Sequence, residues 1–168
     1  MHFLGPYLGV GLLAATRSCR SLATMSAGSS ATTFFQSTLV KAVVGASADR
    51  DKFGNKVLRS YIENKMSCVP INKKTKEIEG LPTVESLTTL QKQLPFMGAS
   101  SMSQVGVSLI TPPGVTKLII EEAYSLGVRS FFLQPGTSDA LTDAYLSGLK
   151  DCNIVKGCVL VELGFDGH

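Results

Sequence analysis

A short apolar segment followed by a turn of small residues is the feature of this chain best suited to binding chemistry. Residues 41–54 are KAVVGASADRDKFG, in which the apolar run ends at Gly45, Ala46 and Ser47 and a helical pattern begins near Gly54. Small residues at such a turn let backbone N–H groups approach a phosphate closely, and the dipole of the following helix favours negative charge. The spacing therefore predicts a phosphate-binding turn at the end of a first strand.

The end of the second predicted strand indicates which nucleotide this turn would bind. Residues 68–72 are CVPIN, and Lys73 and Lys74 follow them. An NAD site usually has an Asp or Glu at this position, which holds the ribose 2′-hydroxyl. Two lysines without a carboxylate suit an additional phosphate on the ribose, as in NADP or coenzyme A. The alternative is a solvated turn in which Lys73, Lys74 and Lys76 face nearby glutamates.

Apolar runs alternate with helical patterns through the rest of the chain and predict the elements that position these turns. We expect strands at 39–45, 68–72, 105–111, 128–134 and 155–163, and helices at 32–37, 56–65, 84–91, 115–126 and 139–149. Residues 72–80 are predicted to be a polar turn, and residues 94–104 a loop. The alternation predicts an α/β fold: a Rossmann-like, doubly wound, parallel sheet of about five strands in a single domain. Segments 45–54, 70–74 and 110–114 should converge where the strand order reverses.

The first 30 residues differ in composition from the rest. No Asp or Glu precedes Asp49, whereas Arg17, Arg20 and many Ser, Thr and Ala residues are present. This composition is typical of a mitochondrial transit peptide; a secretory or plastid-type signal and a cytoplasmic form starting at Met25 are the alternatives. We therefore expect residues 1–30 to be a targeting presequence, removed or disordered, and residues 31–168 to form the folded domain.

Composition argues against several functional classes. A net charge of +3 is too small for a dedicated nucleic-acid binder, and no apolar run reaches the roughly 18–20 residues that span a bilayer. The four cysteines form no CxxC pair and have no His partner at zinc-ligand spacing. Cys68 and Cys158 are expected to be buried thiols within strands. The sequence thus predicts no metal site and no disulfide framework.

Several short motifs occur in one order along residues 37–163. They are VVGAS with KFG shortly after, VPIN, EGLPTVESL, SLITPP and FFLQPG. In this order the chain resembles the CoA-binding domain family, which includes the nucleotide-binding domain of the succinyl-CoA synthetase alpha subunit and its small stand-alone relatives. The resemblance implies a Rossmann-like (NAD(P)-binding-like) domain whose ligand is coenzyme A or an acyl-CoA.

The resemblance also implies roles for residues near the first turn. Gly45, Ala46 and Ser47 would line the pyrophosphate, with the Ser47 hydroxyl and backbone N–H groups as donors. Lys52 would supply a charge near the phosphates. Phe53 would pack at the mouth of the pocket, unless it belongs to the core.

Residues after the other strands would hold the remainder of the ligand. By the same resemblance, Pro70 and Asn72 would flank the adenosine part, with Lys73 near its phosphate. The wall along the pantetheine arm would come from the residues after the third strand, Thr111, Pro112 and Pro113. Gln134 follows the fourth strand, where it could donate to the ligand or cap the strand; we favour contact with the ligand.

The chain offers no set of catalytic groups. The synthetase transfers a phosphoryl group through a histidine in a further domain, but this chain has only His2 and His168, which are outside the predicted site. It also has no GxSxG elbow, P-loop lysine or paired carboxylates. Cys158 could form a mixed disulfide with the CoA thiol, but a structural role is favoured. We therefore expect binding without catalysis by this chain alone.

Two further functional classes stay open. One is an NADP-dependent oxidoreductase-like protein, which is disfavoured because the predicted cleft has no Tyr/Lys or His acid–base pair. The other is a subunit that completes an acyl-CoA enzyme together with a partner chain. A homo-oligomer or a protein partner is compatible with the sequence.

Overall fold

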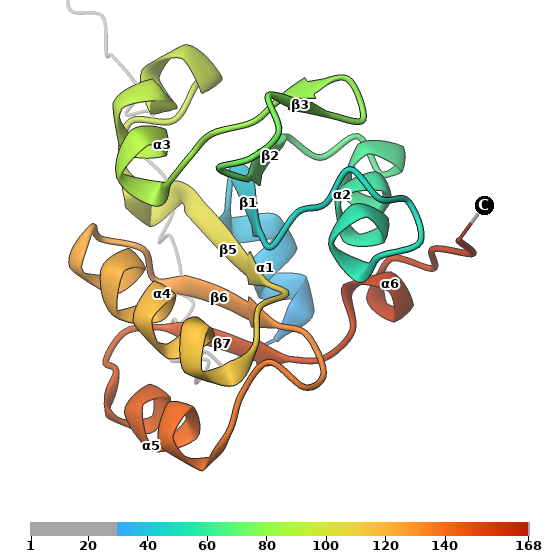
Figure 1. Cartoon of the computed structure of the whole chain (residues 1–168). Coiled ribbons are helices and arrows are strands. Elements are labelled where there is room, and N and C mark those ends of the chain that lie inside the picture. The colour runs from blue at the N-terminus through green and yellow to red at the C-terminus, as the bar shows by residue number, and fades with distance from the viewer. Residues whose placement is uncertain (1–29, 168) are drawn as a thin grey trace, which may run out of the picture.

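A five-stranded parallel sheet forms the centre of the protein. The computed structural model describes residues 30–167, so the predicted presequence lies outside the described residues apart from its last position. The strands are β1 (Val40–Val44), β2 (Cys68–Ile71), β5 (Val105–Leu109), β6 (Ser130–Leu133) and β7 (Asn153–Lys156). They lie in the order β2-β1-β5-β6-β7, and all neighbours are parallel (Figure 1). The predicted doubly wound α/β fold is confirmed.

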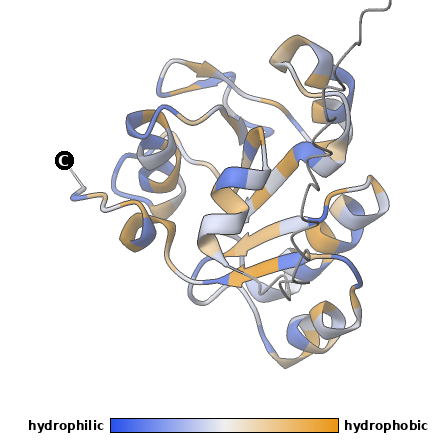
Figure 2. Cartoon of the chain, turned by 180° about the vertical axis from the view of Figure 1, so that it is seen from behind, coloured by the Kyte–Doolittle hydropathy of each residue, from blue (hydrophilic) through white to orange (hydrophobic). Residues whose placement is uncertain are grey.

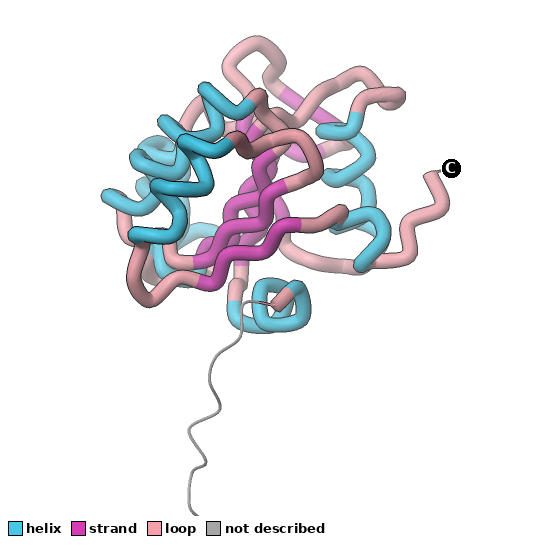
Figure 3. The backbone as a smooth tube through the Cα atoms, turned by 90° about the horizontal axis from the view of Figure 1, so that it is seen from below, coloured by secondary structure: helices cyan, strands magenta, loops and turns pink. Residues whose placement is uncertain are grey.

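Helices cover both faces of this sheet, so the domain has three layers, with the sheet in the middle (Figure 3). On one face, side chains of α1 (Ala31–Ser37), α2 (Phe53–Glu63) and α6 (Val159–Glu162) share a core cluster with Val43 and Phe132. On the other, side chains of α3 (Leu87–Gln93), α4 (Pro113–Ser125) and α5 (Ala140–Gly148) pack into the second cluster. The sheet is thus buried on both sides.

The central strands are apolar because they have no solvent-facing side. Every residue of β1, β5 and β6 is buried, as expected for parallel strands covered by helices. Figure 2 shows this as orange concentrated along the strands, with mixed colours on the helices. Lys41 is the charged exception in β1; its ammonium donates to the carbonyl oxygens of Phe35 (3.0 Å) and Thr38 (2.5 Å). These bonds tie the end of α1 to the sheet.

Helices α3 and α5 begin where a short polar side chain caps them. Ser86 Oγ accepts from the Thr89 N–H at the start of α3, and Asp139 Oδ1 accepts from the Thr142 N–H at the start of α5. Such caps satisfy backbone donors that have no partner in the first turn of a helix. Helix α4 begins at Pro113, whose fixed φ suits the first helical position.

A small hairpin follows β2 where the sequence predicted only a polar turn. Strands β3 (Glu77–Ile78) and β4 (Leu81–Pro82) pair antiparallel around Glu79 and Gly80, whose φ values are 50° and 77°. Positive φ at both central residues is the condition for the tight turn that suits hairpins. In the predicted loop 94–104, two short 3-10 helices occur, η1 (Leu94–Met97) and η2 (Met102–Gln104).

The predicted final strand at 155–163 is wrong beyond Lys156. Strand β7 ends there, the chain turns at Gly157, and residues Val159–Glu162 form helix α6. The short apolar run after Gly157 forms a helical turn instead of a strand, and this turn places Val159 in the core. Cys158 is therefore at the N-cap of α6 and not within a strand, whereas Cys68 is in β2 as predicted. Both cysteines are half-buried, so the prediction that they are fully buried is wrong.

Cys68 makes the stability of the fold sensitive to alkaline pH. Burial raises the pKa of its thiol from 9.0 to about 11, against the opposing effect of Lys41. The folded chain holds this proton more tightly than the unfolded chain, so the stabilisation is complete below pH 9 and is lost between pH 9 and 11. We expect the free energy of unfolding to fall by up to about 2 kcal/mol across this interval from this group.

Urea unfolding at several pH values from 8 to 11 checks this expectation. Cys68→Ser should show a smaller decline than the wild type. A residual decline is expected in both proteins because burial also raises the pKa of Tyr61. Parallel curves for the two proteins would contradict the role given to Cys68.

Candidate functional site

The strand order reverses at β1, which has β2 on one side and β5 on the other. The loops that follow β1 and β5 diverge from this point. Doubly wound folds bind their ligands at such a switch point, at the carboxyl edge of the sheet. The loops are in close contact at their start: the Ile110 N–H donates to the Val44 carbonyl at 3.0 Å. Two of the three segments predicted to converge therefore do so.

Two glycines allow the turn after β1 to form. Gly45 has φ +96°, and a Cβ there would lie 3.0 Å from the Ile110 carbonyl oxygen. A Cβ on Gly54 would lie 2.0 Å from the Gly45 carbonyl oxygen, so the first turn of α2 packs directly on this turn. No described side chain caps α2 at Lys52, so the first N–H groups of this helix have no side-chain partner. The turn after β1 therefore packs closely against both Ile110 and the first turn of α2.

A polar network that is buried at Asn55 and Arg59 and reaches the surface at Glu79 and Arg50 holds the loop between the turn and α2. The amide of Asn55, which is fully buried, donates to the Ser47 carbonyl and to Glu79 Oε1, both at 2.9 Å, and accepts from Arg59 Nε at 3.0 Å. Arg50 Nε lies 3.4 Å from the same Glu79 oxygen. The network thus ties the loop after β1 to the β3–β4 hairpin.

Asn55, Arg59 and Glu79 were missed by reasoning from the sequence. The sequence feature that could have identified Asn55 and Arg59 is their spacing: they are four positions apart on the buried face of α2, where an amphipathic helix is usually apolar. Glu79 belongs to the EGLPTVESL motif, but its partner Asn55 is 24 residues away in sequence.

Asn72 connects the loop after β2 to the turn after β1. Its Nδ2 donates to the Ala46 carbonyl at 2.8 Å, and its Oδ1 accepts from the N–H groups of Lys74 (2.7 Å) and Thr75 (3.1 Å). The third predicted segment therefore also reaches the switch point. Pro70 is buried within β2 opposite Val43, two positions before Asn72.

The predicted phosphate ligands lie on exposed loops beside this connection. Ser47 is half-buried, and its Oγ accepts from the Asp49 N–H at 3.1 Å. Lys52 and Lys73 are exposed. Lys73 borders a small hollow of about 250 Å³ whose other lining residues are Asn72, Lys74, Thr75, Lys76, Thr83 and Glu85.

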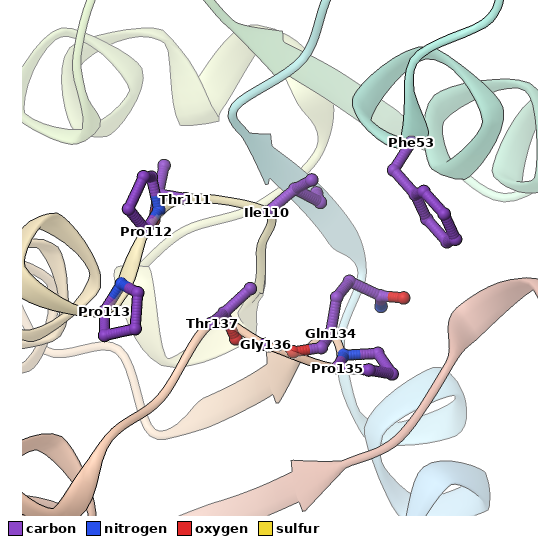
Figure 4. Close-up of a pocket in the computed structure, with 9 residues that line it drawn as sticks. All are labelled: Phe53, Ile110, Thr111, Pro112, Pro113, Gln134, Pro135, Gly136 and Thr137. Carbon is purple, nitrogen blue, oxygen red and sulfur yellow. Dashed lines mark hydrogen bonds between the residues drawn. The ribbon is translucent and has the colours of Figure 1, made fainter.

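A separate cleft of about 390 Å³ lies over the ends of β5 and β6 (Figure 4). It is lined by Phe53, Ile110, Thr111, Pro112, Pro113, Gln134, Pro135, Gly136 and Thr137. Five predicted site residues therefore meet here: Phe53, Thr111, Pro112, Pro113 and Gln134. The cleft does not include the predicted residues of the neighbouring loops, Gly45, Ala46, Ser47, Lys52, Pro70, Asn72 and Lys73.

Phe53 stands at the mouth of this cleft and not in the core. Its side chain is 52% exposed, which excludes the core alternative. Ile110 and residues 135–137 also line the cleft although the sequence analysis did not single them out as ligand contacts. Ile110 belongs to the SLITPP motif, Pro135 and Gly136 belong to FFLQPG, and Thr137 follows it directly, so the motifs themselves are the signal that could have identified them.

The side-chain amide of Gln134 is buried and only half satisfied. Gln134 is 3% exposed, and its Oε1 accepts from the Val159 N–H at 3.2 Å, at the start of α6. Its Nε2 is buried without a hydrogen-bond partner among the described residues. The amide thus caps α6 with its oxygen and leaves its two N–H donors unpaired.

Charge is divided sharply between the loops and the cleft. The cleft lining contains no ionisable side chain, whereas the loops beside it carry charges of both signs: Arg50, Lys52, Lys73, Lys74 and Lys76, with Asp49, Asp51, Glu77 and Glu79. In residues 30–167 no three His, Cys, Asp or Glu side chains gather as a metal-binding group. No helix in the same range is long and apolar enough to cross a membrane.

The fold and the switch-point cleft define a doubly wound α/β protein with a site at the carboxyl edge of its sheet. The chain matches the family described as the CoA binding domain over residues 40–164, and it belongs to this family. The resemblance inferred from the short motifs is confirmed. None of the curated proteins matches the chain.

Solved structures of three proteins share this fold. A conserved hypothetical protein from Pyrococcus furiosus is 25% identical, with a TM-score of 0.59 over 74% of this chain and 98% of that chain. A hypothetical protein from Pyrococcus horikoshii OT3 is 19% identical (TM-score 0.61; 78% and 84% covered). A Thermus thermophilus protein is 21% identical (TM-score 0.63; 78% and 92% covered).

Proposed function

We propose that this protein binds coenzyme A or an acyl-CoA at the carboxyl edge of its sheet. The observation that carries the proposal is the division of charge: a glycine turn and charged loops that include Lys52 and Lys73 adjoin an uncharged, mostly apolar cleft. Coenzyme A has the same division, with its phosphates at the nucleotide end and an uncharged pantetheine arm. Membership of the CoA binding domain family supports this match.

The ligand would lie across the sheet edge in a defined direction. The pyrophosphate would bind the turn at Gly45–Ser47 and the first N–H groups of α2, and the ribose phosphate would lie near Lys73. The pantetheine arm would follow Thr111 and the adjacent prolines into the cleft. This direction uses all three segments that converge at the switch point.

We propose binding without chemistry by this chain alone. The hydroxyls in the cleft are committed to local contacts: Thr137 donates to the Gln134 carbonyl at 2.7 Å, and Thr111 pairs with Thr116 at 2.7 Å. The lining supplies neither a carboxylate nor an imidazole or thiol to act on a thioester. Sensing, buffering or delivering the CoA compound suits such a site.

Calorimetric titration of the full chain with CoA, dephospho-CoA, NADPH and NAD tests the proposal. We expect CoA to bind more tightly than dephospho-CoA, because only CoA carries the ribose phosphate near Lys73. Tighter binding of NADPH would favour the oxidoreductase-like alternative. Absence of binding by all four compounds would overturn the proposal.

Removing either phosphate-facing lysine should weaken CoA binding. We expect Lys52→Ala and Lys73→Ala each to cost about 1–3 kcal/mol, the range for hydrogen bonds to charged groups. Affinity should also depend less on salt concentration in each variant than in the wild type. Lys150→Ala is the matched control, because Lys150 is exposed just before β7, at the opposite edge of the sheet. Unchanged affinity in both lysine variants would place these side chains in solvent instead.

A further inference from the structure

The segment that follows α6 packs against the polar network behind the loop after β1. The ring of Phe165 lies against the Arg59 guanidinium, whose Cζ is 5.1 Å from the centroid of the ring. Figure 1 shows α6 beside α2, the helix that carries Arg59. Phe165 directly follows residues 40–164, the range that matches the CoA binding domain family. The contact therefore adds a residue from outside that range to the surroundings of the candidate site.

The end of α6 places Phe165 at this position. The Gly164 N–H donates to the Val161 carbonyl at 3.2 Å, and the Phe165 N–H donates to the Leu160 carbonyl at 2.8 Å. With Gly164 at φ 62°, these two bonds form a Schellman motif, in which the residue after the glycine turns back toward the helix. Helix α6 is itself anchored in the core, where Val159 is fully buried. Phe165 is thus held in place by the backbone that ends this helix.

Arg59 connects Phe165 to the loop after β1 through two sets of hydrogen bonds. Its Nε donates to Asn55 Oδ1 at 3.0 Å, and the Asn55 amide donates to the Ser47 carbonyl at 2.9 Å. Its Nη2 donates to the Arg50 carbonyl at 3.5 Å. The position of the guanidinium therefore affects where the backbone lies at residues 47 and 50.

The aromatic ring is suited to hold a guanidinium that is also hydrogen-bonded. The face of a ring attracts a cation, and the attraction increases where water is excluded. Arg59 is 7% exposed and Phe165 is half-buried, so the contact is partly shielded from water. An aliphatic side chain could fill the same space, but it has no such face. The ring therefore restrains Arg59 in a way that apolar packing alone does not.

We propose that Phe165 is a positioning residue for the binding of CoA compounds: through Arg59 and Asn55, its ring orders the loop that would receive the phosphates. The inference rests on the proposed function. When a loop spends less time in its binding conformation, the apparent affinity falls by the same fraction. Loss of the ring should therefore weaken binding, although Phe165 is not among the residues proposed to contact the ligand.

Titration of the wild-type full chain, Phe165→Leu and Phe165→Tyr with CoA tests the proposal. We expect Phe165→Leu to bind about three- to tenfold more weakly, in keeping with the strength of one cation–π contact. Phe165→Tyr keeps a ring and should bind as the wild type does. Phe96→Leu is the matched control, because Phe96 is 90% exposed in η1, and it should change nothing. Wild-type affinity in Phe165→Leu would overturn the proposal, whereas failure of the wild type itself to bind CoA would overturn the proposed function.

Hydrogen exchange in the absence of ligand separates positioning from a purely structural role. The amides at 46–52 should exchange faster in Phe165→Leu than in the wild type, and at the wild-type rate in Phe165→Tyr. A role in global stability alone would lower the urea concentration at which Phe165→Leu unfolds and leave exchange in this loop unchanged. That result would contradict the proposal.

Combining Phe165→Leu with Asn55→Asp shows whether the effect passes through the network. Asn55→Asp already removes the donor to the Ser47 carbonyl. Adding Phe165→Leu should then weaken CoA binding by less than about twofold, because the two residues act in one chain of contacts. A further loss as large as the one that Phe165→Leu causes in the otherwise wild-type chain would show independent effects and overturn the proposal.

Discussion

Gly54→Ala is expected to abolish CoA binding and to remove about 3 kcal/mol or more from the free energy of unfolding. The added Cβ would lie 2.0 Å from the Gly45 carbonyl oxygen and 3.2 Å from the Ala46 Cα, so the obstacle is backbone on a buried strand end. Relief requires α2 to move away from β1. That movement would break the turn and withdraw the first N–H groups of α2 from the phosphates.

Gly148→Ala provides the control for this substitution. Gly148 is the last residue of α5, and a Cβ there would have no neighbour within 4 Å. Alanine should stabilise the protein slightly, by up to about 1 kcal/mol, because it restricts the unfolded chain. Urea unfolding and calorimetric titration compare the two variants. A Gly54→Ala protein as stable as Gly148→Ala and able to bind CoA would contradict the close packing of α2 on the turn.

The strands that are buried on both faces are among the elements predicted correctly. Strands β1, β5 and β6 are continuous apolar runs because helices cover both sides, and such runs are recognised without knowledge of their partners. The β3–β4 hairpin has two residues per strand, too few to show a period. The run at 155–163 fails for another reason: a short apolar stretch suits a buried strand or a buried helical turn equally, and only packing against α2 decides.

In the candidate site, too, some residues could be predicted from the sequence and others could not. The glycine turn and the residues after β5 and β6 are contiguous motifs, so the sequence predicts them together. The Asn55 network joins residues from a helix, a loop and a hairpin, and its members are ordinary polar residues until the fold brings them into contact. The sequence also could not predict the structural role of Asn72. Its side chain makes hydrogen bonds to Ala46, Lys74 and Thr75 and so holds two loops together, whether or not it also contacts a ligand.

Asn55→Asp should give the second large effect, a loss of about 2–4 kcal/mol in the free energy of unfolding and at least about tenfold weaker CoA binding. Aspartate keeps the size of the side chain and the acceptor for Arg59 Nε. It replaces the donor that faces the Ser47 carbonyl and Glu79 Oε1, each at 2.9 Å, by a second acceptor. A buried carboxylate would then oppose Glu79 and release the loop at Ser47.

Asn64→Asp at the exposed end of the same helix is the matched control, because it changes the same groups outside the network. We expect it to cost about 1 kcal/mol, because it removes the hydrogen bond from Asn64 Nδ2 to the Ser60 carbonyl (2.9 Å) and adds an unfavourable charge near the C-terminus of α2. Hydrogen exchange of the amides at 46–52 shows whether the loop is released, and it should accelerate only in Asn55→Asp. Lower stability with unchanged CoA affinity would mean that the network stabilises the β3–β4 hairpin without ordering the phosphate-binding loop. Loss of both together would instead show that the loop is ordered for its ligand through the side chain of Asn55.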